Sequence, residues 1–88
     1  MFQEELKKII KKLSYPLKDD EELKMALKRK LTKKEFKLLE YRVYNATKQE
    51  MQDKLGVDEK RLEEIDKRLM QKLNFEKIKH ELMVVKDS

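Results

Sequence analysis

The sequence lacks cysteine altogether, and among its 88 residues it has one glycine, one proline and one histidine. Without cysteine the chain can form neither a disulfide framework nor a thiolate metal site, which is typical of a cytoplasmic protein. So little glycine and proline, with 47% charged residues, predicts a mostly helical chain with short connections. A chain of this length buries only about 60 to 65% of its unfolded surface, so we expect one small domain without a large active-site cavity.

Long apolar runs are absent as well. Lysines interrupt the N-terminal segment, and no stretch approaches the length of a membrane span or of a signal-peptide core. We therefore expect a soluble protein of the cytoplasm that has no membrane partner.

Residues for catalysis or metal binding are scarce. His80 stands alone, with neither a cysteine nor a second histidine to complete a zinc site. No nucleophile, base and orienting group can be assembled from the sequence, and it has no glycine-rich loop to hold phosphates. The sequence therefore predicts no enzyme, no catalytic residue, no cofactor and no bound metal.

Charge is abundant but unevenly placed. Residues 24–48 carry nine basic and two acidic side chains, whereas residues 58–66 carry two basic and five acidic ones. A polyanion should prefer the middle of the chain, unless these lysines are simply the solvated face of a lysine-rich protein. Only four of the 23 basic residues are arginines. Because lysine binds phosphate as a point charge and arginine provides bidentate base recognition, any DNA binding should be salt-sensitive and poorly discriminating.

Apolar residues recur with helical period along nearly the whole chain, which predicts an all-α bundle of five or six helices in a single domain, residues 1–88. In the N-terminal helical pair, residues 1–30, we expect one helix from Phe2 to Ser14, ended by Tyr15-Pro16, and a second that begins near Asp19 or Asp20. The apolar stripe of the first helix either completes the domain's own core or pairs with a second copy. A homodimer is therefore left open.

Three further helix starts have local signatures. The pairs with the spacing of capping boxes are Thr32–Glu35 and Thr47–Glu50. Asp58 can cap the helix that follows it, and Asn45 and Gly56 can adopt the left-handed conformation that ends the helices before them. These signals predict three short, consecutive helices with tight connections.

The last predicted stripe is long and clean, with Leu62, Ile65, Leu69 and Leu73 at helical spacing. Residues 74–88 form either a bent continuation or a short sixth helix, because the apolar positions shift there, and Lys86 to Ser88 should fray. The shifted apolar positions are Phe75, Ile78, Leu82 and Val85. The chain's three tyrosines, Tyr15, Tyr41 and Tyr44, are able to stack on bases, but we expect them to pack at the edge of the core.

The stretch from Thr47 to Ile65 has the spacing of a helix-turn-helix, in which two helices cross closely and the second presents its N-terminal face to a DNA groove. A wider pattern includes this stretch: Leu31-Thr32, Glu35, Leu38-Leu39, Thr47, Glu50-Met51, Leu55-Gly56-Val57, Arg61-Leu62, Ile65, Arg68 and Lys72-Leu73. Over these residues, 31–73, the chain resembles region four of bacterial housekeeping sigma factors, which binds the upstream promoter element. The resemblance implies a helix-turn-helix core and a role in transcription.

Two functions remain open. The first is DNA binding with low base specificity through five basic side chains: Lys33, Lys34, Lys48, Lys60 and Arg61. The second is a protein-interaction module of the same fold that docks RNA polymerase or a transcription regulator without binding DNA. It is favoured by three acidic side chains, Glu59, Glu63 and Glu64, because carboxylates repel phosphate and can only accept hydrogen bonds from bases.

Overall fold

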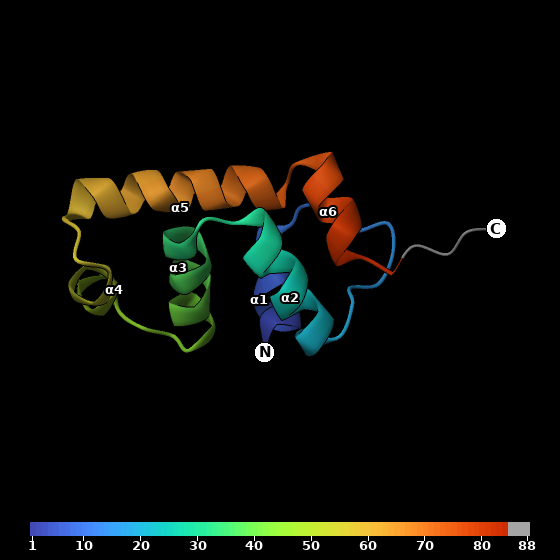
Figure 1. Ribbon diagram of the computed structural model, residues 1–88, viewed down its shortest axis with the longest axis horizontal. Helices are drawn as coiled ribbons and strands as arrows, with labels where there is room; N and C mark the ends of the chain where they lie inside the picture. Colours follow the sequence, from blue (N-terminus) through green and yellow to red (C-terminus); the bar gives the residue numbers. More distant parts are fainter. Residues whose placement is uncertain (85–88) are drawn as a thin grey trace.

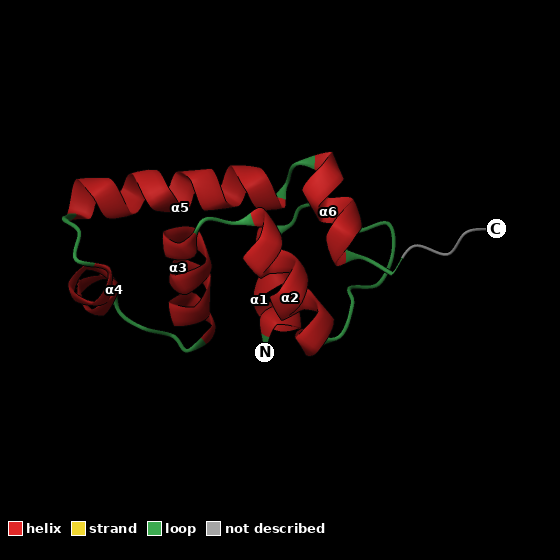
Figure 2. Ribbon diagram, viewed as in Figure 1, coloured by secondary structure: helices red, strands yellow, loops and turns green. Residues whose placement is uncertain are grey.

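The computed structural model describes residues 1–84, which form six α-helices and no β-strand beyond an isolated antiparallel bridge between Leu17 and Met83 (Figures 1 and 2). The helices are α1 (Phe2–Ile9), α2 (Asp20–Lys30), α3 (Lys33–Val43), α4 (Lys48–Leu55), α5 (Glu59–Leu73) and α6 (Glu76–Leu82). The predicted all-α fold is confirmed, with a short sixth helix rather than a bent fifth one. Within the described residues no helix is long and apolar enough to cross a membrane.

The longest helix, α5, organises the fold. It packs against α1, α3, α4 and α6, and α3 begins beneath it and runs away from it (Figure 1). Its predicted stripe is buried: Leu62, Ile65, Leu69 and Leu73. Each fully buried leucine contributes about 1.5 to 3 kcal/mol relative to an exposed one, so this stripe is a main source of stability.

The predicted local signals lie where the sequence places them. In both capping boxes the threonine hydroxyl accepts from the glutamate amide and the glutamate side chain accepts from the threonine amide, at the starts of α3 and α4. Asp58 accepts from the amide of Arg61 at 2.8 Å and caps α5. Asn45 and Gly56 have φ angles of 59° and 66°, which end α3 and α4 as expected.

The first helix is five residues shorter than predicted. Instead of reaching Ser14, α1 ends at Ile9, and Ile10 has extended backbone angles. The cause is tertiary: the Asn74 side chain accepts from the amide of Lys11 at 3.1 Å and donates to the Ile9 carbonyl at 3.3 Å. These bonds satisfy backbone groups that a longer helix would have satisfied itself. The apolar stripe of α1 is covered by α2, α3 and α5, so it completes the chain's own core.

A few side-chain predictions are wrong. Phe75 has 57% of its surface exposed because it stands at the N-cap of α6, outside the helical stripe that buries Leu82. Tyr44, at the C-cap of α3, is 68% exposed and Tyr15 is 40% exposed, whereas Tyr41 is half-buried as expected. Val85 and the predicted frayed end, Lys86 to Ser88, lie outside the described residues.

Candidate nucleic-acid interface

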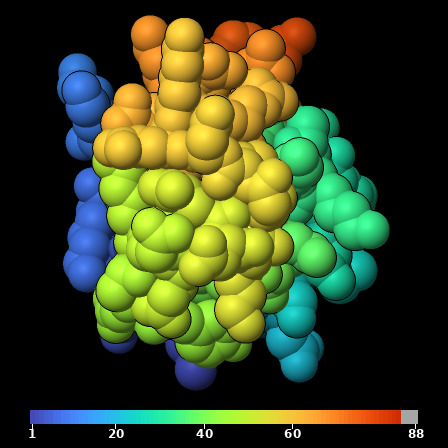
Figure 3. Space-filling model, turned by 90° about the vertical axis from the view of Figure 1, so that its left-hand side faces the viewer, coloured from blue at the N-terminus to red at the C-terminus, as the bar shows by residue number. Residues whose placement is uncertain are grey.

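Three helices, α3, α4 and α5, pack against one another at one end of the molecule. Seen end-on, α4 and the first turns of α5 cover this end (Figure 3). The chain reverses between them at Gly56, and the amide of Val57 donates to the Gln52 carbonyl at 3.0 Å. None of the α4 residues is fully buried, but Met51 and Leu55 pack against the core from its edge. The arrangement therefore leaves the outer surfaces of α4 and α5 exposed.

All five basic residues predicted to contact DNA lie in the first turn of a helix and are exposed: Lys33 and Lys34 in α3, Lys48 in α4, and Lys60 and Arg61 in α5. By contrast, the first turns of α1 and α2 carry only acidic residues among their charged side chains. The positive end of the helix dipole disfavours cations by about 0.3 to 1 kcal/mol each. The first turns of α3, α4 and α5 each contain one glutamate as well: Glu35, Glu50 and Glu59. Helix stability therefore explains the acidic residues of these first turns but not the lysine and arginine side chains beside them.

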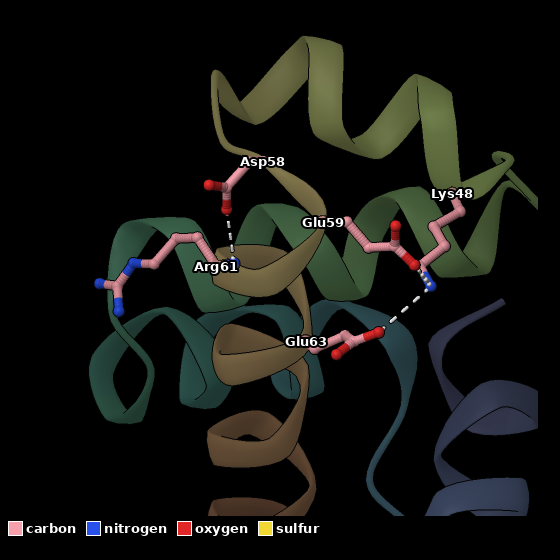
Figure 4. A network of polar contacts seen from close by, with 5 residues as sticks. All are labelled: Lys48, Asp58, Glu59, Arg61 and Glu63. Carbon is pink, nitrogen blue, oxygen red and sulfur yellow. Dashed lines mark hydrogen bonds and ion pairs between the residues drawn. The ribbon is translucent and has the colours of Figure 1, made fainter.

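One side of α5 is acidic, and the structure neutralises it. Lys48 donates to Glu59 at 2.8 Å and to Glu63 at 3.4 Å (Figure 4). Arg42 pairs with Asp66 further along the same side. The hydrogen bonds to Glu59 and then Glu63 raise the pKa of Lys48 above its ordinary value. By charge along the sequence, Lys48 and these two glutamates favour opposite functions. The fold brings them together, so Lys48 already has partners within the protein.

The other side of α5 is basic. Arg61 points away from the Lys48 cluster (Figure 4) and lines an open cleft of about 340 Å³ with Lys33, Lys34 and Arg68. We call these four residues and the space between them the basic cleft. Arg61 also donates to the exposed Glu64 at 3.1 Å, whereas Lys33, Lys34 and Arg68 form no ion pair within residues 1–84.

The basic cleft lies between the start of α3 and one side of α5, and a buried ion pair holds these helices together. Glu35 is 2% exposed and accepts from Lys72 at 2.8 Å and from the Thr32 amide at 2.9 Å. Burial tends to raise the pKa of Glu35, but these hydrogen bonds outweigh it and the net pKa is lowered. Among residues 1–84, Glu35 is the one carboxylate that lines the cleft, and Lys72 neutralises it.

The fold thus separates the eight predicted site residues into groups. Lys33, Lys34 and Arg61 share the basic cleft, Lys48 is paired with Glu59 and Glu63, and Lys60 and Glu64 are exposed on the outer face of α5. Arg68 is not among the five predicted basic residues, although its spacing of seven residues from Arg61 places it on the same side of the helix. Within the described residues, no three acidic or histidine side chains are arranged to hold a metal ion.

No protein-family model, curated protein or solved structure matches this chain. The resemblance to sigma region four therefore stays a prediction from the residues.

Proposed function

We propose that this chain is a helix-turn-helix protein, of the sigma region-four type, that binds duplex DNA with little base specificity in the course of transcription. The observation that carries the proposal is the set of exposed cations in the first turns of α3 and α5, Lys33, Lys34, Lys60 and Arg61. Their positions oppose the helix dipole, and a phosphate bound there would offset that cost.

The arrangement of α3, α4 and α5 also supports this proposal. A short turn at Gly56, which has a left-handed conformation, joins α4 to α5, and α3 packs against both helices. This arrangement fits a helix-turn-helix, which presents its second helix to DNA. Under this proposal α5 is the helix nearest the groove and α3 holds the phosphate backbone.

Low base specificity follows from the side chains at the start of α5. Carboxylates accept hydrogen bonds and cannot donate to guanine, and Glu59 and Glu63 are already occupied by Lys48. Lys60 contributes a point charge rather than a bidentate contact. Affinity should therefore come mainly from phosphates, and it should fall steeply with salt.

A titration of a fluorescently labelled duplex at about 50 and 200 mM salt tests the proposal. The Lys33→Gln/Lys34→Gln double variant should bind every sequence more weakly, and the slope of log affinity against log salt should fall by about two because two phosphate contacts are lost. The matched control is Lys24→Gln/Lys77→Gln, which makes the same charge change at exposed positions of α2 and α6. If the wild-type protein does not bind duplex at 50 mM salt, DNA binding is refuted.

The second candidate function is docking of RNA polymerase or a transcription regulator. A groove of about 480 Å³ beside the acidic side of α5 favours it, because apolar Leu38, Met51 and Leu62 line it together with charged residues such as Arg42 and Glu63. An apolar centre with a polar rim is typical of a protein-binding surface. In that case the duplex titration shows no binding, and charge removal at Glu59, Glu63 and Glu64 weakens association with the protein partner.

A further inference from the structure

We propose that the basic cleft seats the phosphodiester backbone of one DNA strand, and that Arg68 is a phosphate-binding residue within it. This inference rests on the proposed function and goes beyond it, because it says along which side of α5 the duplex lies. The starting observation is that Arg68, from the middle of α5, lines the same cleft as Lys33 and Lys34 from the start of α3.

The charge of the cleft matches this partner. Within the described part of the chain, four cationic side chains and one carboxylate line it, and that carboxylate, Glu35, is buried and bound by Lys72. Arg61 shares its guanidinium with Glu64, but both side chains are about half exposed, so this pair is weak and a phosphate can replace it. Arginine also binds phosphate oxygens in a bidentate manner, which gives Arg61 and Arg68 more than a point-charge role.

The length of the cleft favours a continuous backbone over a free phosphate. Seven residues separate Arg61 from Arg68, which corresponds to about 10.5 Å along the helix axis. Successive phosphates of a strand lie farther apart along the backbone than the rise of about 3.4 Å per nucleotide along the duplex axis, so the two arginines can reach two neighbouring phosphates. A single phosphate ion would contact one end of the cleft, whereas a strand can contact both.

Seating the backbone in the cleft also removes the conflict between DNA and two of the three glutamates, Glu59 and Glu63, whereas Glu64 stays beside Arg61. Glu59 and Glu63 lie on the opposite side of α5, where Lys48 holds them (Figure 4). A duplex approaching from the Arg61 and Arg68 side would not place phosphates against these carboxylates. The acidic start of α5 is then compatible with binding, and base readout by α5 becomes unnecessary.

The test compares Arg68→Gln with Lys67→Gln in the duplex titration. Lys67 is the matched control because it is exposed, forms no ion pair within residues 1–84 and lies about 100° around the helix from Arg68. We expect Arg68→Gln to weaken binding about three- to tenfold and to lower the salt slope by about 0.9, with a much smaller effect for Lys67→Gln. Arg68→Lys should fall between wild type and Arg68→Gln. Circular dichroism of each variant checks that the exposed substitution leaves the fold intact.

The outcomes separate the two proposals. If the wild type binds duplex but Arg68→Gln and Lys67→Gln lose affinity equally, the strand does not lie in the cleft, and the inference is wrong while DNA binding stands. If Lys67→Gln loses more, the strand lies on the outer face of α5 and the inference is again overturned. Absence of any wild-type binding at 50 mM salt refutes the proposed function and this inference together.

Discussion

Replacing Glu35 with glutamine removes the buried charge that joins α3 to α5. The Glu35 carboxylate is 2% exposed and accepts from the Lys72 ammonium at 2.8 Å and the Thr32 amide at 2.9 Å. Glutamine keeps the shape and one acceptor oxygen, so Thr32 retains a partner, but the charge that attracts Lys72 is lost. Hydrogen bonds to charged groups contribute about 1.5 to 3 kcal/mol to stability.

We expect the lower end of that range. The Lys72 side chain is 34% exposed, so after the substitution its ammonium can be hydrated instead of remaining buried without a partner. Glu35→Gln should therefore lower the free energy of unfolding by about 1.5 kcal/mol at pH 7. For a chain of this size that corresponds to a melting temperature lower by about 6 to 12 °C.

The loss should depend on pH. The folded pKa of Glu35 lies below its ordinary value of 4.5, so the ionised carboxylate stabilises the fold above about pH 4.5. This contribution disappears as the pH falls through the folded pKa, because the wild-type carboxyl then becomes neutral like the glutamine. Urea unfolding of both proteins at pH 7 and near pH 3 measures the difference, which should shrink at low pH.

A matched control exists in the second capping box. Glu50 occupies the same position relative to Thr47, but it is exposed, and within the described residues no lysine ammonium lies within salt-bridge distance of it. Glu50→Gln should therefore cost less than Glu35→Gln. If both variants lose the same free energy of unfolding, or if the Glu35→Gln loss is as large near pH 3 as at pH 7, the ion pair with Lys72 is not the source of the effect. A double-mutant cycle with Lys72→Gln isolates the pair directly.

Three further changes test other parts of the structure. The Glu59→Gln/Glu63→Gln double variant should strengthen duplex binding modestly, because it removes two negative charges and frees Lys48 on the side of α5 away from the basic cleft. A marked loss of affinity in the fluorescence titration speaks against DNA as the partner. Asn74→Ala should lower the free energy of unfolding by about 1 to 2 kcal/mol and speed amide hydrogen exchange at the end of α1, since it removes the hydrogen bonds to Ile9 and Lys11. Unchanged exchange there would show that Asn74 does not cap α1. Gly56→Ala should cost about 1 to 2 kcal/mol in urea unfolding through backbone strain alone, because apart from the adjoining residues no atom of residues 1–84 lies within 4 Å of the added carbon. Gly56→Asn should cost less.

The helix starts were predictable because their signals are local. In Thr32–Glu35, Thr47–Glu50 and the Asp58 cap, donor and acceptor lie three residues apart, so they meet whenever the helix forms. The stripe of α5 was predictable for the same reason, since helical period alone places its apolar residues on one side. The conformations of Asn45 and Gly56 follow from the few residue types that tolerate a positive φ.

The site was predictable only in part. The sequence indicated which stretch is basic and which is acidic, and it predicted Lys33, Lys34 and Arg61, which share the basic cleft, as DNA contacts. It did not show that Lys48 lies against Glu59 and Glu63, because that contact depends on the angle between α4 and α5. Charge counted along the chain therefore assigned these residues to opposing functions, whereas their packing makes them one neutralising cluster.

By itself the sequence determined that the chain is all-helical. It also determined where α2, α3, α4 and α5 begin and where α3 and α4 end, because capping residues and helical periodicity act within one or two turns. Only the tertiary structure decided where α1 ends, because the cap is Asn74, 65 positions from Ile9. It also decided which cations lie together in the basic cleft. Arg68 lines the same cleft as Lys33 and Lys34 because α3 packs against α5. That packing depends on the core and on the ion pair between Glu35 and Lys72, which are distant in the chain.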